Sequence, residues 1–244
     1  WQDHVPMRKT GLRRLVLLLI FLIALTYSPA FQCTNALTLV QPETVRIGDA
    51  SWYLWHQPAS DTLLIWLGGG VVEPMRLLVN EYEFESYNTR RFIQELAEHY
   101  DVLALKEGSL SYRDSELNRT ISREPYPSSR NYMTMIRLWA NEQGYRYRYV
   151  VGYSVGAMVA AEELILASPE GWTSPNGLII ITTKIPQRAS SEASSLRASL
   201  LLLYGGKVAP EFTSSGQDFF QRAPGEGWKD GFWFHKEYHV IPEV

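Results

Sequence analysis

Residues Val150 to Met158 read Val-Val-Gly-Tyr-Ser-Val-Gly-Ala-Met, a Gly-x-Ser-x-Gly pentapeptide behind an extended apolar run. The run over 147–151 is mostly β-branched and aromatic, which is typical of a buried strand. The stretch 156–167 is rich in Ala, Met, Glu and Leu and favours a helix. A serine between a strand end and a helix start lies on a sharp turn, where a Cβ on either flanking glycine would collide with a neighbouring element. The segment therefore predicts an exposed, nucleophilic hydroxyl on Ser154, and a plain glycine turn is the alternative.

The bulk composition is that of one medium-sized globular domain. The chain has 244 residues and a formal net charge of −3, with no basic stripe, so nucleic-acid binding is not predicted. Its single cysteine, Cys33, excludes an intrachain disulfide framework. No Cys/His cluster has zinc-ligand spacing, and neither a metal nor an organic cofactor is predicted.

The first 36 residues differ in character from the rest. Basic residues at positions 8, 9, 13 and 14 precede an apolar run from Leu15 to Tyr27, and Ser28-Pro29-Ala30 follows. This order predicts a secretory signal peptide. If it is not cleaved, the same segment becomes a membrane anchor, although the run is shorter than the roughly 20 residues of a full span. We therefore expect an extracytoplasmic protein, either secreted or tethered to the membrane by residues 1–36.

The remaining residues, 37–244, form one predicted domain in which strand-like and helix-like blocks alternate. Strands are predicted over 37–47, 50–56, 62–67, 100–105, 147–151, 177–182, 200–204 and 231–238. Helices are predicted over 89–99, 130–143 and 156–167, with a brief helical link over 190–197. Residues 108–129 lack a clear period and are interpreted as a surface loop. Apolar runs alternating with helices predict an α/β fold with a mostly parallel sheet covered on both faces.

The serine turn behind the fifth strand, and Leu67-Gly68-Gly69-Gly70 behind the third, resemble the α/β-hydrolase family over about residues 37–244. The resemblance implies that Ser154 attacks an acyl carbon and that the backbone N–H of Val155 binds the oxyanion. Gly69 and Gly70 are candidates for the second backbone donor, and a tight packing turn is the alternative. Leu67 replaces the histidine that is usual there, but backbone donors do not depend on it.

The resemblance also implies a histidine base and an orienting acid. Tyr238-His239-Val240-Ile241-Pro242, expected after the last strand, is similar to the base segment of small carboxylesterases, so His239 is the predicted base. His235 is predicted to lie within that strand.

The acid position departs from the family pattern. An aspartate is expected behind Gly205-Gly206-Lys207, but Val208 stands there. Glu211, predicted to lie in the same loop, is the candidate acid, and a solvated loop residue is the alternative. Asp218 is a weaker substitute.

Together these features predict a serine hydrolase of carboxylic esters that acts on a small-molecule acyl ester outside the cytoplasm. Only residues 184–198 separate the sixth and seventh predicted strands, which is too short for a cap domain, so the site is expected to be open. Peptidase or thioesterase activity would use the same acyl-enzyme. Val208 leaves a different class open, a membrane-tethered, non-catalytic binding or accessory protein on a hydrolase scaffold.

Overall fold

The computed structural model describes residues 41–58, 60–68, 84–107, 112–114, 119–121, 129–166, 176–229 and 232–242. The predicted leader, residues 1–36, lies outside this part of the chain, as do Gly69 and Gly70. Within the described ranges, no helix combines the length and apolar character needed to cross a bilayer.

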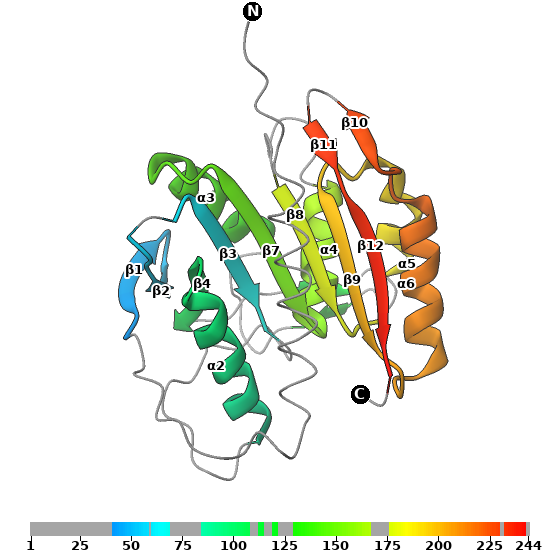
Figure 1. Cartoon of the computed structure of the whole chain (residues 1–244), viewed down its shortest axis with the longest axis horizontal. Helices are drawn as coiled ribbons and strands as arrows, with labels where there is room; N and C mark the ends of the chain where they lie inside the picture. The colour runs from blue at the N-terminus through cyan, green and yellow to red at the C-terminus, as the bar shows by residue number, and fades with distance from the viewer. Residues whose placement is uncertain are drawn as a thin grey trace, which may run out of the picture.

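The centre of the fold is an eight-stranded sheet with the order β1-β2-β4-β3-β7-β8-β9-β12 (Figure 1). β2 pairs antiparallel with β1 and with β4, and every other neighbouring pair is parallel. The predicted mostly parallel sheet is therefore confirmed. Its strands are β1 (Glu43–Ile47), β2 (Ala50–Trp55), β3 (Thr62–Leu67), β4 (Asp101–Glu107), β7 (Tyr147–Tyr153), β8 (Asn176–Ile181), β9 (Ser199–Gly205) and β12 (Lys236–Ile241).

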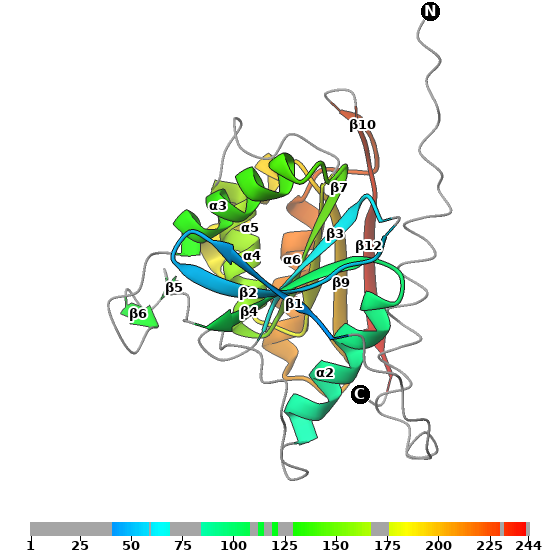
Figure 2. The ribbon, with the colours of Figure 1, turned by 90° about the vertical axis from the view of Figure 1, so that its left-hand side faces the viewer.

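Helices cover both faces of the sheet, as Figures 1 and 2 show. On one face lies α2 (Phe84–Ala97). On the other face lie α3 (Ser129–Glu142), α4 (Val155–Leu166), α5 (Gln187–Ser191) and α6 (Pro210–Arg222), with a short 3₁₀ turn, η2 (Ala193–Ser195).

Two small two-stranded sheets complete the described fold. β5 (Tyr112–Asp114) pairs with β6 (Arg119–Ile121) inside the stretch predicted to be a surface loop. β10 (Gly227–Lys229) pairs with β11 (Phe232–Phe234) just before β12.

Successive residues of a strand pack alternately into two hydrophobic cores, one on each face of the sheet. In β3, Leu63, Ile65 and Leu67 pack on the side of α3 to α6, whereas Leu64 and Trp66 pack on the side of α2. Because both faces of the parallel strands are buried, these strands read as continuous apolar runs rather than alternating ones. This is why the sequence located them well.

The sequence predicts no helix over the residues of α6 and places Glu211 in a loop, whereas the structure has a helix there. Its central Thr-Ser-Ser-Gly segment has weak helix propensity, which conceals the helical pattern. Phe212 and Phe219, seven residues apart, nevertheless both pack against the core. Gly216 is there for close packing, because a Cβ at that position would lie 2.5 Å from Cζ of the Tyr204 ring.

The last predicted strand was also misplaced. The strand is interrupted at His235, which lies between β11 and β12. β12 then runs to Ile241 in parallel register with β9. His239, predicted to follow the strand, therefore lies within it, and His235, predicted within it, lies outside. A strand boundary set by hydrogen bonds to a neighbouring strand leaves little trace in local sequence.

We expect Leu202→Ala to lower the free energy of unfolding by about 2–5 kcal/mol, because Leu202 in β9 is fully buried and its loss leaves a cavity. Leu138→Ala, at a half-exposed site on α3, should change it by less than about 0.5 kcal/mol. Urea unfolding of both variants tests this. Equal effects would contradict the assigned core.

Candidate active site

Ser154 occupies a strained turn between β7 and α4. Its φ of 54° lies in the left-handed region, which is uncommon for a residue with a side chain. The Ser154 N–H donates to the carbonyl of Ile181 at the end of β8, at 3.1 Å, and holds the turn against the sheet. The residue as a whole is partly exposed. Backbone strain of this kind, held by surrounding structure, occurs preferentially at functional sites.

The two flanking glycines are required by close backbone contacts. A Cβ on Gly152 would lie 2.4 Å from Cα of Ala157, and one on Gly156 would lie 2.1 Å from the carbonyl oxygen of Leu67. Gly156 thus lets the first turn of α4 press against the end of β3. The steric reason inferred from the pentapeptide is therefore the one found in the fold.

The α4 N-terminus lies directly behind the serine. Val155 is the first helical residue, and none of the described residues accepts its backbone N–H. A free N–H at the positive end of a helix suits a developing negative charge. The role of Val155 in an oxyanion hole remains a prediction, and that of Gly69 and Gly70 falls outside the described residues.

His239 lies level with the end of β7 but on the outermost strand of the sheet. Its register partner in β9 is Leu203, which pairs with Ile181 of β8, which in turn pairs with Tyr153 of β7. Three strand steps of about 4.8 Å place the two backbones about 14 Å apart. Among the described residues, no hydrogen bond joins His239 to Ser154; the imidazole Nε2 lies 2.9 Å from Oε2 of Glu237 instead.

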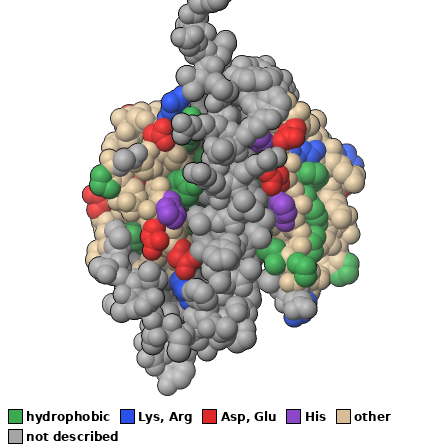
Figure 3. Space-filling view, viewed as in Figure 1, with side chains coloured by type: hydrophobic (Ala, Val, Ile, Leu, Met, Phe, Trp, Pro, Cys, Tyr) green, Lys and Arg blue, Asp and Glu red, His purple; other side chains and the backbone are tan. Residues whose placement is uncertain are grey.

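The side chain of His239 points to the α2 side of the sheet. Leu203, its register partner, packs in the core on that side. Figure 3 shows this face of the molecule, on which histidine side chains lie beside acidic ones.

Glu211 lies in the other layer. It is exposed in the first turn of α6, a helix that packs on the side of α3 to α5. Val208, at the expected acid position, is half-buried against the same core. No hydrogen bond or ion pair links Glu211 to His239 in the described part of the chain.

Glu237 was not singled out by the sequence, although its spacing of two from His239 on a strand places both side chains on one face.

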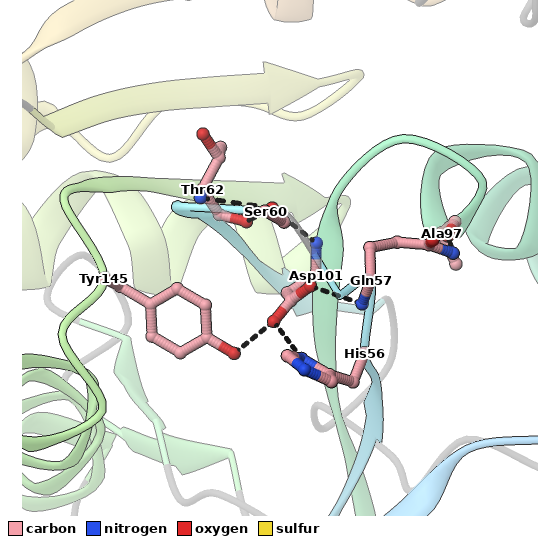
Figure 4. Close-up of polar contacts among 7 residues, drawn as sticks. All are labelled: His56, Gln57, Ser60, Thr62, Ala97, Asp101 and Tyr145. Carbon is pink, nitrogen blue, oxygen red and sulfur yellow. Dashed lines mark hydrogen bonds and ion pairs between the residues drawn. The ribbon is translucent and has the colours of Figure 1, made fainter.

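The other described histidines lie at the opposite edge, where the parallel strands begin. His235 pairs with Glu226 at 2.9 Å, just before β12. His56 Nδ1 lies 2.8 Å from Oδ2 of Asp101, the first residue of β4 (Figure 4). Among the described histidines, His239 therefore lies nearest the edge that carries Ser154.

Asp101 organises that opposite edge. It is fully buried, and it accepts the backbone N–H of Gln57 at 2.7 Å and the Tyr145 hydroxyl, besides contacting His56 (Figure 4). Burial first, and then the hydrogen bond to Asp101, raise the pKa of the Tyr145 phenol above its ordinary value. The cluster ties β2, β4 and the α3–β7 turn together.

Comparisons with solved structures agree with this topology. An esterase from the bacterial hormone-sensitive lipase family matches with a TM-score of 0.56 and 14% identity, over 96% of this chain and 88% of that one. The dienelactone hydrolase from Anabaena variabilis matches with a TM-score of 0.53 and 13% identity, over 83% and 85%. A mutant of the esterase E40 matches with a TM-score of 0.55 and 14% identity, over 96% and 89%.

The chain thus has the α/β-hydrolase fold. No protein-family model and no curated protein sequence matches it. At this level of identity the likeness describes the fold, so the roles of individual residues rest on the geometry above.

Gly156→Ala should lower the free energy of unfolding by about 1–3 kcal/mol or more, because the added methyl overlaps the Leu67 carbonyl. Gly225→Ala is the matched control, since a Cβ there meets no atom within 4 Å. Urea denaturation of both variants checks the expectation. A Gly156→Ala protein as stable as the control would contradict the close contact between α4 and β3.

Asp101→Asn should lower the free energy of unfolding by about 1–3 kcal/mol. The amide NH₂ then faces a donor group whose hydrogen bond the carboxylate had accepted. Asp218→Asn, which removes an exposed pair with Arg222 on α6, should cost less than about 1 kcal/mol. Thermal or urea unfolding at neutral pH distinguishes the two. Equal losses in the free energy of unfolding would contradict the stabilising role of Asp101.

Proposed function

We propose that this protein is a serine hydrolase that cleaves carboxylic esters, with Ser154 as its nucleophile. The single observation that supports this most strongly is the left-handed backbone of Ser154 between β7 and α4. That conformation costs free energy, about 1–2 kcal/mol for an L-residue. Here the strain presents a hydroxyl beside a helix N-terminus, which is the arrangement that a serine nucleophile needs.

The proposed reaction follows from this geometry. The Ser154 hydroxyl adds to the ester carbonyl carbon as its proton passes to a base, and the carbonyl oxygen becomes an anion near the Val155 N–H. Collapse of this intermediate breaks the C–O bond, and the alcohol leaves with the proton. Water then attacks the acyl-enzyme and releases the carboxylic acid. Thioesters and peptides would pass through the same intermediate.

His239 is the proposed base. It is the described histidine nearest the edge that carries Ser154, and it follows the serine in the chain as the base does in hydrolases of this fold. A general base must come within about 2.6–3.2 Å of the proton it takes. The proposal therefore requires a reacting conformation in which the serine turn and the His239 side chain come within that distance of each other.

The substrate and the location are part of the same proposal. β8 and β9 are joined by α5 and η2 alone, with no inserted cap, which supports an open site for a small-molecule acyl ester. The basic and apolar residues of 1–36 support an extracytoplasmic enzyme, either secreted or tethered by that segment.

A second candidate function is a non-catalytic binding or accessory role on the same scaffold. Two observations favour it: the three strand steps between Ser154 and His239, and the apolar Val208 at the acid position. In this case the strained serine turn is a property of the fold without chemistry.

Ser154→Ala should lower hydrolysis of p-nitrophenyl acetate by roughly 10⁴-fold or more, to the background rate, because it removes the nucleophile. It should also abolish labelling by a fluorophosphonate probe, which requires an activated serine. The measurements are the initial rate and the fluorescence of the labelled band.

Ser214→Ala, at an exposed serine on α6, is the matched control and should keep wild-type labelling and turnover. Equal labelling of wild type and Ser154→Ala would exclude Ser154. Absence of any labelling or turnover by the folded wild-type protein at neutral pH would instead favour the binding role.

A further inference from the structure

We propose that Glu237, carried by the same strand as the base, is the carboxylate that orients His239. This inference rests on the proposed function and assigns its missing acid. Glu237 Oε2 lies 2.9 Å from His239 Nε2, which is hydrogen-bonding distance. Glu211 lies in the opposite helical layer, and Val208 has no carboxylate.

The strand geometry brings the two side chains together. Positions two apart on a strand lie about 7 Å apart on one face of the sheet, within reach of a glutamate and an imidazole. The register confirms the shared face, because Glu237 and His239 pair with Leu201 and Leu203, which belong to one core. The Tyr238 side chain points the opposite way, where its ring stacks on Tyr204.

The pair is held on a well-anchored segment. All six residues of β12 are in register with β9, and the Tyr204–Tyr238 ring contact, with centroids 5.7 Å apart, fixes the strand from its other face. Both polar side chains are only partly exposed, at 29% for Glu237 and 36% for His239. A partly shielded carboxylate on a strand that is paired along its whole length can restrict the rotation of the imidazole.

The contact determines which ring nitrogen can act. With the carboxylate accepting from Nε2–H, the lone pair of the neutral imidazole lies on Nδ1. When Nδ1 takes the serine proton, the imidazolium that forms remains hydrogen-bonded to a negative carboxylate, which stabilises it. Glu237 is thus a positioning residue, since it acts through His239 and does not touch the substrate.

The test combines kinetics with an NMR signature on the full-length protein. Glu237→Gln should lower kcat for p-nitrophenyl acetate by about 10²-fold or more with KM nearly unchanged, because it removes the charge that stabilises the imidazolium. Glu237→Leu should in addition remove the slowly exchanging imidazole N–H proton signal that is correlated with Nε2. His239→Gln assigns that signal by its loss.

Glu226→Gln is the matched control. It removes the charge from a second glutamate–histidine contact among the described residues, Glu226 to His235, which has the same 2.9 Å length but lies at the far edge of the sheet. This variant should keep the kcat and the Nε2–H signal of His239. Circular dichroism melting of each variant separates a loss of fold from a loss of orientation.

Three results would overturn the inference. One is an active wild-type enzyme whose kcat is unaffected by Glu237→Gln. Another is a loss of kcat that follows Glu211→Gln instead. The third is an Nε2–H signal that survives in Glu237→Leu. A wild-type protein with neither turnover nor fluorophosphonate labelling would overturn the proposed function itself. An active enzyme whose kcat does not depend on Glu237 would overturn only the role of Glu237.

Discussion

The rest of the site depends on one close contact, in which Gly156 in the first turn of α4 presses against the Leu67 carbonyl at the end of β3. That contact and the Gly152–Ala157 approach allow the helix to start immediately behind the strand. The turn between them is then so short that Ser154 must adopt a positive φ. The strain at Ser154 and the position of the Val155 N–H at the start of α4 both follow from this approach of helix to sheet.

The two edges of the sheet have different roles, because one stabilises the fold and the other carries the proposed nucleophile. Where the parallel strands begin, the buried Asp101 carboxylate contacts His56, the Gln57 N–H and the Tyr145 hydroxyl, which come from two separate segments, and so stabilises the fold. Where they end, Ser154 sits on a strained turn with few described partners. Parallel strands direct their carboxyl ends, and the helix N-termini that follow, to one edge, and ligands bind there in sheets of this kind. The strained turn persists because the structure around it holds it in place, through the Ser154 N–H bond to Ile181 and the close contacts at Gly152 and Gly156.

The arrangement around His239 shows how a sheet can assemble a pair that its loops do not provide. The loop behind β9 carries valine where an acid is expected, and the following helix places Glu211 in the other layer. Alternation along β12 instead sets a carboxylate beside the imidazole on the α2 face. The pair needs no long-range loop closure, since strand periodicity alone creates it.

The sequence by itself determined the serine turn, the fold class and most strands, because continuous apolar runs and a glycine-flanked serine are local signals. It did not find α6, whose Thr-Ser-Ser-Gly centre opposes a helix until Phe219 and the close approach of Gly216 to Tyr204 stabilise it. Nor did it place His239 within β12 or pair it with Glu237, because hydrogen bonds from β9 extend that strand. Local propensity fixes what a segment favours, whereas tertiary contacts decide where weak segments end and which side chains meet.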